Sequence, residues 1–248
     1  MTHAGYFEGI GGFSLAAEWA GIDTIYTCEN NEFRHAWLKQ ILPKAIHEKD
    51  ITTANGHYAD IFTAGFPCQD ISVANARGKG LEGARSGLFW DFFNIVGNLR
   101  PRYIILENSP NLIHKGLDDI VKALSKIGYD CEWEIISKKA FGFPDLRKRI
   151  FIVAYSDQVR RNHADKVFNQ QHLEMCFKKV INQKQIQIET ERIFDEPSLR
   201  EAHTIAVKND SGLSDRLAQD EIEAYGDAVC PYVAMFVLEM IKKFDEKR

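Results

Sequence analysis

The sequence predicts an α/β fold in which a mostly parallel sheet carries helices on both faces. Along the first 156 residues, short β-rich runs alternate with amphipathic helical patterns, which is typical of such a sheet. The chain has 248 residues, of which 45% are hydrophobic, enough for one large core. No internal repeat or low-complexity tract is present, so we expect one large domain with at most a small appendage.

The expected strands are short runs rich in β-branched and aromatic residues. A brief first strand precedes the glycine cluster that begins at Gly9. Five further strands are expected at residues 22–29, 59–66, 102–108, 132–137 and 149–156.

The expected helices lie between these strands. Residues 116–128 place five apolar residues on one helical face and stop at Gly128. Residues 88–99 read as a more buried helix, and residues 14–21 read as a short helix that ends at Gly21.

The composition of the chain changes after Ser156, where the residues become mostly polar and the hydrophobic periodicity becomes weak. We therefore divide the chain into a main domain (1–156), a small module (157–205) and a C-terminal segment (206–248). Between residues 157 and 200 the charges nearly cancel, with eight Lys or Arg against seven Asp or Glu. Two interpretations of the basic residues in "RRNH" and "FKKVINQK" stay open. They could contact DNA phosphates, or they could form a solvated helical face.

Composition excludes several classes of protein. The formal net charge of −4 argues against a protein that coats nucleic acid non-specifically. The five cysteines are an odd number without a Cys-x-x-Cys pair, so neither a disulfide framework nor a metal site is expected. No apolar stretch reaches the roughly 18 residues of a membrane span, and the N-terminus does not resemble a signal peptide. We expect a cytoplasmic protein with no membrane contact.

The stretch "YFEGIGGFSLAAEWAG" (6–21) is a glycine-rich turn between a strand and a helix. Such glycines allow positive φ and close approach of a ligand to the backbone. Glu29 follows at the end of the next strand, where doubly wound folds place an acid against ribose hydroxyls. A dinucleotide, another adenosine-containing ligand and a purely structural turn remain alternatives for this pattern.

The stretch "AGFPCQDIS" (64–72) places Cys68 at the mouth of a strand. The following glycine-rich loop carries Arg77, Lys79 and Arg85. Nearby cations lower the pKa of a thiol and favour a nucleophilic thiolate, whereas an isolated cysteine in an apolar context is usually structural.

Two further blocks end or begin strands. Glu107 and Asn108 end an apolar strand, so burial should raise the pKa of the carboxyl and allow acid chemistry near neutral pH. A helix cap or a loop ion pair is the structural alternative. Arg147 and Arg149 have the same parity as they enter a strand, and we expect both guanidinium groups to project to one side.

Taken together, these blocks resemble the conserved motifs of the cytosine-5 DNA methyltransferase family. The resemblance rests on Phe7-x-Gly9-x-Gly11-Gly12, Gly65-Phe66-Pro67-Cys68-Gln69, Glu107-Asn108, Arg147-x-Arg149 and "YGDAVCPYVA" (225–234), and it covers about residues 5–156 and 210–243. It implies a Rossmann-like S-adenosylmethionine-dependent methyltransferase fold, with residues 157–205 as a small target-recognition module. The last helix would return to pack on the sheet of the main domain.

The resemblance also implies a catalytic mechanism. Cys68 would attack carbon 6 of a cytosine flipped out of double-stranded DNA, and Glu107 would act on ring nitrogen 3. Arg149 would hold the base carbonyl, with Arg147 and Asn108 in support. The loop at residues 73–87 would close over the base.

By the same resemblance, S-adenosylmethionine is the cofactor and S-adenosylhomocysteine its product. Its binding residues would be Phe7, Gly9, Gly11, Gly12, Glu29, Asp50, Ile51, Pro67 and Leu88. The residues implied to contact DNA are Gln69, Ser72, Arg77, Lys79 and Arg85.

The chain departs from the family pattern at Ser109, Asp145 and Asp227, and all three changes leave the nucleophile and the acid in place. Two alternatives stay open: a cofactor-binding subunit that needs a partner chain to recognise DNA, and an RNA cytosine-5 methyltransferase. A companion restriction endonuclease or recognition subunit and a monomeric state are further expectations.

Overall fold

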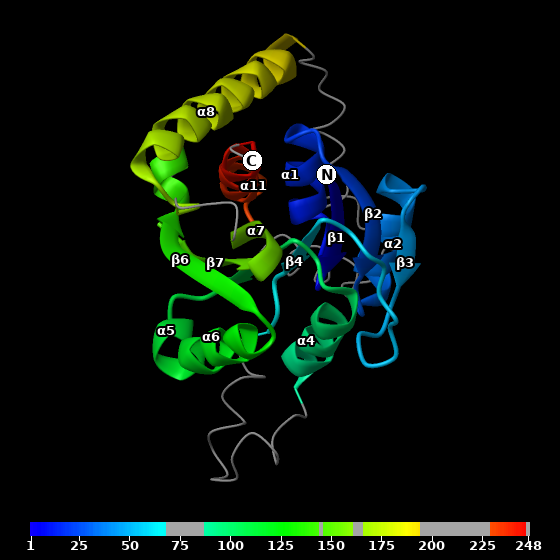
Figure 1. Cartoon of the computed structure of the whole chain (residues 1–248). Helices are drawn as coiled ribbons and strands as arrows, with labels where there is room; N and C mark the ends of the chain where they lie inside the picture. Colours follow the sequence, from blue (N-terminus) through cyan, green and yellow to red (C-terminus); the bar gives the residue numbers. More distant parts are fainter. Residues whose placement is uncertain (68–86, 144–145, 161–165, 194–228, 247–248) are drawn as a thin grey trace.

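The computed structural model describes residues 1–67, 87–143, 146–160, 166–193 and 229–246. Seven strands form one sheet in the order β3-β2-β1-β4-β5-β7-β6 (Figure 1). The strands are β1 (Thr2–Tyr6), β2 (Asp23–Cys28), β3 (Ile46–Glu48), β4 (Ile61–Ala64), β5 (Tyr103–Asn108), β6 (Tyr129–Ser137) and β7 (Lys148–Ser156).

Parallel pairing dominates the sheet, which confirms the predicted fold class. β1 pairs in parallel with β2 and β4, β2 with β3, and β4 with β5. β7 runs antiparallel to both β5 and β6. The chain builds outward from β1 to β3 and then restarts at β4 on the other side of β1. The carboxyl ends of β1 and β4 therefore flank the point where strand order reverses, which is where open α/β sheets bind ligands.

Helices cover both faces of the sheet (Figure 1). One apolar cluster joins the sheet to α1 (Gly12–Trp19), α8 (Gln170–Ile193) and α11 (Pro231–Asp245). The other joins it to α4 (Leu88–Leu99), α5 (Leu112–Lys115) and α6 (Leu117–Lys126). β5 shows the alternation that this requires, because Tyr103 and Ile105 lie in the first cluster and Ile104 and Leu106 in the second.

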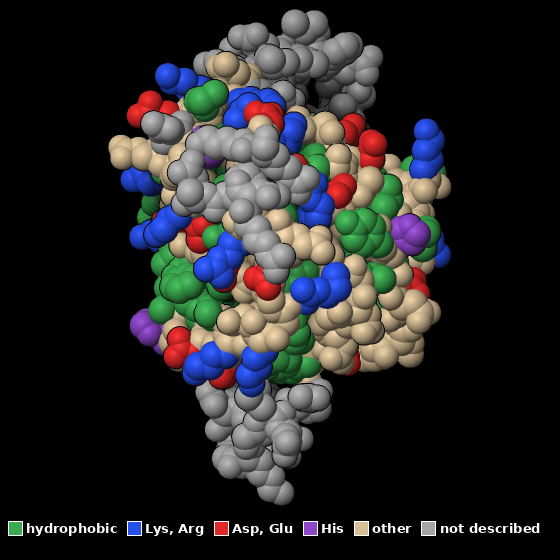
Figure 2. Space-filling model, in the orientation of Figure 1, with side chains coloured by type: hydrophobic (Ala, Val, Ile, Leu, Met, Phe, Trp, Pro, Cys, Tyr) green, Lys and Arg blue, Asp and Glu red, His purple; other side chains and the backbone are tan. Residues whose placement is uncertain are grey.

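Three further elements complete the described parts of the chain. They are α2 (Glu32–Ile41), the 3₁₀ helix η1 (Lys138–Phe141) and α7 (Asp157–Arg160). No helix within the described ranges is both long and apolar enough to cross a membrane. Acidic and basic side chains are interspersed on the face shown in Figure 2.

The observed elements match the expected ones closely where hydrophobic periodicity is strong. The helix expected at residues 88–99 is α4, and the expected strands contain β2, β4 and β5. β6 and β7 begin three residues and one residue earlier than expected. The sequence interpretation missed β3, which has three residues, and α2, in which only His35 and Leu38 are buried. It also missed α8, where the polar composition hides a helix of 24 residues.

The first half of α8 packs against α11 within the core. Cys176 and Val180 are buried there, and the rings of Phe141 and Phe177 lie 5.3 Å apart. Glu239 of α11 is 1% exposed and pairs with Lys179 of α8 at 2.8 Å. The division of the chain into three parts at residues 156 and 205 remains a prediction.

α11 returns to lie against α1 (Figure 1). At the start of α1, a Cβ atom built on Gly12 would lie 2.7 Å from the carbonyl oxygen of Val229 and 2.6 Å from its side chain. At the other end of α11, Asp245 forms an ion pair with Arg102 and accepts a hydrogen bond from the hydroxyl of Tyr103. The C-terminal helix is thus attached to the main domain at both ends.

The contact at Gly12 predicts opposite effects for two glycine substitutions. G12A should lower the free energy of unfolding by about 1–3 kcal/mol, because the methyl group overlaps backbone that cannot move aside freely. G97A on α4 should raise it by about 0.5–1 kcal/mol, because a Cβ there meets nothing within 4 Å and alanine favours a helix. Urea denaturation of both variants tests this, and a stabilised G12A would contradict the tight contact.

Candidate active site

Most of the predicted site residues lie at the carboxyl edge of the sheet, at the ends of strands or in the loops that follow them. β1 leads into the loop at residues 7–11, β2 ends next to Glu29, and β4 leads into Phe66 and Pro67. β5 ends at Glu107 and Asn108. Because β7 is antiparallel, Arg149 lies near its start and therefore at the same edge.

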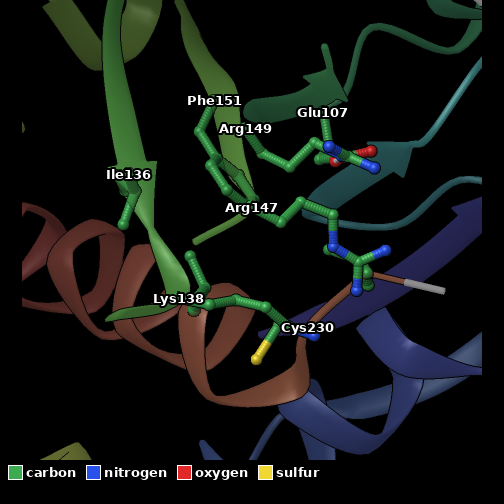
Figure 3. A pocket seen from close by; sticks show the side chains of 9 residues that line it. Glu107, Ile136, Lys138, Arg147, Arg149, Phe151 and Cys230 are labelled. Atoms are coloured by element: carbon green, nitrogen blue, oxygen red, sulfur yellow. Dashed lines mark ion pairs between the residues drawn. The ribbon is translucent and has the colours of Figure 1, made fainter. Parts of the chain in front are cut away.

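Glu107 and Arg149 form the central ion pair of this edge. Arg149 Nε lies 2.7 Å from Glu107 Oε1, and Figure 3 shows the guanidinium group pointing at the carboxylate. The Glu107 side chain is 11% exposed. Burial raises the pKa of Glu107 to about 7, although Arg149 and Arg147 act in the opposite direction. The carboxyl group can therefore carry a proton near neutral pH.

Asn108 holds the segment that leads to Cys68. Its Nδ2 donates a hydrogen bond of 2.9 Å to the carbonyl oxygen of Phe66, and its Oδ1 accepts one of 2.7 Å from the amide of Ser109. Asn108 is 4% exposed, and its bond to Phe66 is buried. Phe66 lies two residues before Cys68. Its hydrogen bond with Asn108 therefore fixes the backbone just after the carboxyl end of β4.

Gly65 allows three of these segments to meet. A Cβ atom built there would lie 3.6 Å from Glu107 Oε2 and 3.8 Å from the carbonyl oxygen of Phe7. The acid, the strand that leads to Cys68 and the start of the glycine-rich loop are therefore in close proximity. Pro67, which follows Phe66, is exposed.

Several predicted residues lie outside the described parts of the chain. They are Cys68, Gln69, Ser72, Arg77, Lys79 and Arg85, together with the family departures at Asp145 and Asp227. Their assignments remain predictions.

A pocket opens beside the Glu107–Arg149 pair (Figure 3). Arg147 and Lys138 line it from the starts of β7 and η1, and Val229 and Cys230 line it from the segment before α11. The sequence analysis did not select Lys138. The signal available was the lysine doublet "KK" (138–139) immediately after a strand.

The predicted cofactor residues surround the glycine-rich loop. Phe7, Gly9 and Gly11 all have positive φ, at 53°, 63° and 93°. Glu29, which is 8% exposed, accepts hydrogen bonds from the amides of Gly9 at 2.8 Å and Asn31 at 3.0 Å. Glu29 follows the end of β2, and its carboxylate holds the glycine-rich loop in place.

The remaining predicted cofactor residues border the same edge. Ile51 is buried in the apolar cluster against which Phe7 and Leu88 also pack. Asp50 is exposed and accepts hydrogen bonds from the amide and hydroxyl of Thr52, which lower the pKa of its carboxyl.

Glu8 is a functional candidate that the sequence analysis missed. Its Oε1 accepts hydrogen bonds of 2.7 Å from both the amide and the hydroxyl of Ser14, at the start of α1. Its Oε2 is buried without a hydrogen-bond partner, and burial raises the pKa of Glu8 to about 7. A charged residue between Phe7 and Gly9 was the available signal, but sequence alone does not show that its side chain turns inward.

Comparison with known proteins identifies the family. A family model described as C-5 cytosine-specific DNA methylase matches residues 1–224. This chain belongs to that family. The relatives include the type II methyltransferase M2.BsuMI of Bacillus subtilis, 31% identical over 183 residues that cover 70% of this chain and 46% of that one. M.HhaI of Haemophilus parahaemolyticus is 28% identical, covering 62% of this chain and 48% of that one.

Solved structures agree with the fold. A putative DNA modification methyltransferase encoded within an E. coli prophage matches with a TM-score of 0.55 and 23% identity, over 68% of this chain and 50% of that chain. The S. pombe Dnmt2 methyltransferase matches with a TM-score of 0.54 and 22% identity, over 63% of this chain and 51% of that chain. These likenesses confirm the Rossmann-like methyltransferase fold. The chain spans about half the length of the curated relatives given above.

The buried carboxyl of Glu8 predicts a pH dependence of stability. Its pKa is higher in the folded chain than in the unfolded one, so between about pH 5 and pH 7 the folded chain binds the extra proton. The Glu8 contribution to the free energy of unfolding should therefore fall as pH rises through this window, by about 1.4 kcal/mol per unit of pKa difference. His3, whose pKa burial lowers to about 3, contributes in the opposite direction below about pH 6.5.

E8Q should remove the Glu8 share of the slope and leave the contributions of Glu107 and His3, which oppose each other. Glutamine keeps an oxygen for Ser14 but has no proton to lose. Urea denaturation at pH 5, 6, 7 and 8 measures the slope, with E18Q on the exposed face of α1 as the control. Parallel curves for wild type and E8Q would show that Glu8 titrates normally.

Proposed function

We propose that this chain transfers a methyl group from S-adenosylmethionine to carbon 5 of a cytosine in DNA, through a covalent adduct with Cys68. The carrying observation is the buried Glu107 carboxyl, paired with Arg149 and placed against the segment that leads to Cys68. Membership of the C-5 cytosine-specific DNA methylase family supports the reaction class.

The residues at the carboxyl edge fit S-adenosylmethionine. A Cβ atom built on Gly9 meets nothing within 4 Å, so the loop borders open space where a ligand can approach the backbone. Glu29 stands beside this loop, and a carboxylate at the end of the second strand suits ribose hydroxyls. Phe7, Ile51 and Leu88 offer apolar surface for the adenine, with Asp50 at its edge.

The proposed chemistry uses an acid and a nucleophile of this chain. Carbon 5 of cytosine is a weak nucleophile, so the Cys68 thiolate first bonds to carbon 6 and the electron pair of the 5,6 double bond shifts toward carbon 5. Glu107 donates its proton to ring nitrogen 3 and thereby stabilises this adduct. Arg149 and Arg147 hold the base and the acid in register, and Asn108 keeps the Cys68 segment in place.

S-adenosylmethionine, when bound, supplies an electrophilic methyl group. After carbon 5 has taken it, a general base removes the carbon-5 proton, the 5,6 double bond re-forms, and the thiolate leaves carbon 6. Glu107 recovers its proton from nitrogen 3, so the protein ends as it began. A cytosine inside a duplex cannot reach these groups, and we infer that the base is flipped out of double-stranded DNA, with residues 73–87 closing over it.

Two of the basic residues that could contact DNA phosphates form ion pairs within the protein. Among the basic residues considered for phosphate contact, Arg160 pairs with Asp130 and Lys179 with Glu239. These cations are therefore engaged within the protein. A recognition role for residues 157–205, a cytoplasmic location, a monomeric state and a companion restriction endonuclease or recognition subunit stay predictions.

Two other functions are separable by experiment. Parallel methylation assays on duplex DNA and on tRNA distinguish the DNA enzyme from an RNA cytosine-5 enzyme. A purified chain that binds S-adenosylmethionine but methylates DNA only after a second protein is added would identify a subunit. Bisulfite sequencing of DNA from cells that express the chain gives activity and target site together.

C68S should abolish methyl transfer while cofactor affinity stays within about twofold of wild type, because only the nucleophile is removed. Transfer from labelled S-adenosylmethionine and isothermal titration calorimetry measure the two quantities. Undiminished turnover in C68S would remove the covalent mechanism.

E107Q should lower kcat by about 10²–10⁴-fold, the usual contribution of acid catalysis, with little effect on cofactor affinity. In the wild-type chain, kcat should fall as pH rises past about 7, because the acid must be protonated and its pKa is raised to about 7. A variant that mainly lost cofactor affinity would show that Glu107 does not stand beside the base.

A further inference from the structure

The loop between β1 and α1 is tied at successive backbone groups. The Gly9 amide donates to Glu29 Oε2 at 2.8 Å, and the Gly11 amide donates to the carbonyl oxygen of Glu8 at 3.1 Å. Between them, the carbonyl oxygen of Ile10 accepts a hydrogen bond of 3.1 Å from Trp37 Nε1. The first two partners belong to the loop and to the predicted site, whereas Trp37 comes from α2.

The bond from Trp37 completes the restraint of one peptide unit. The carbonyl of Ile10 and the amide of Gly11 belong to the same peptide plane, which is therefore held at both ends. Gly11 has a φ of 93°, and glycine moves readily between left-handed and other backbone conformations. Without the indole bond, the bond to the Glu8 carbonyl is the one hydrogen bond of this peptide that remains among the described residues.

α2 is well placed to act as a support for the loop. It starts beside Glu29, whose Oε1 accepts from the amide of Asn31, and Asn31 caps the helix by accepting from the amide of Arg34. A Cβ atom built on Gly11 would lie 3.3 Å from Leu38 and 3.2 Å from Ile41. The helix thus contacts the acid at one end and the glycine loop along its side.

The exposure of Trp37 argues against an ordinary core role. Its side chain is 41% exposed, while its single polar atom is bonded to the loop. A tryptophan that served only to fill the core would be more deeply buried. Trp37 therefore combines partial burial of its ring with one specific hydrogen bond, to Ile10.

We propose that Trp37 is a positioning residue that pre-organises the glycine-rich loop for S-adenosylmethionine. This inference rests on the proposed function, because it assigns the loop to that cofactor. Trp37 does not touch the reacting atoms. It fixes the Ile10–Gly11 peptide in advance, so that the ligand does not have to order the loop when it binds.

The test compares W37F with wild type by isothermal titration calorimetry of S-adenosylmethionine and S-adenosylhomocysteine. Phenylalanine keeps an aromatic ring and removes the N–H donor. Kd should rise about threefold to tenfold for both ligands, as expected for loss of one net hydrogen bond. KM for S-adenosylmethionine should rise by the same factor, with kcat and KM for DNA unchanged.

W133F is the matched control. Trp133 lies on β6, at the edge of the sheet opposite β3, and is 44% exposed. The same chemical change there should leave both affinities as in wild type. W37M, which also lacks the donor, replaces W37F if the phenylalanine variant proves unstable.

A second measurement needs no ligand. Amide hydrogen exchange at Gly11 should be faster in W37F than in wild type, since the loop peptide loses one of its two restraints. Exchange at Gly11 in W133F should be unchanged. A melting temperature of W37F close to that of wild type separates loop positioning from general destabilisation.

The outcomes separate this inference from the proposed function. Equal ligand affinity in W37F and wild type, or an equal loss in W133F, overturns the role of Trp37. A wild-type chain that binds S-adenosylmethionine but methylates neither DNA nor RNA overturns the proposed function, and the comparison of the two variants still decides the role of Trp37. A wild-type chain that binds no S-adenosylmethionine overturns both.

Discussion

The antiparallel pairing of β7 with β5 is the constraint on which the site depends. In a sheet of parallel strands alone, Arg147 and Arg149 would begin their strand at the edge opposite the end of β5. Because β7 runs the other way, Asn108 lies opposite Ile150, and Arg149 reaches Glu107. Because β7 is antiparallel to β5, the two arginines at its start lie near the buried carboxyl group of Glu107.

The same edge concentrates two carboxyl groups in low-polarity surroundings. Burial raises the pKa of Glu8 and of Glu107 to about 7, and each has a different set of partners. Glu107 is balanced by a guanidinium group, whereas Glu8 is held by Ser14 and keeps one oxygen unpaired. Proteins retain buried carboxyl groups mainly where a function needs them. Here Glu8 lies in the glycine-rich loop, and Glu107 lies against the segment that leads to Cys68.

The sequence predicted the sheet and much of the edge because its signals there are local. Apolar runs bounded by glycine or charge define β4, β5 and β7, and Glu107 and Asn108 end one of them. The missing parts depend on tertiary contacts. Neither the inward turn of Glu8 nor the bond from Trp37 to Ile10 leaves a periodic trace, and α8 is held by the burial of a few residues such as Val180.

The attachment of α8 and α11 to each other bears on how far the chain between these two helices can vary in length. Lys179 and the nearly fully buried Glu239 join the two helices, and Val229 enters α11 against Gly12. The core therefore holds α8 through Cys176 and Val180 and holds the start of α11 through Val229. Closure of a longer loop between fixed ends costs only slightly more free energy than closure of a shorter one. The chain between α8 and α11 can therefore differ in length and chemistry at little cost to the folding of the carboxyl edge.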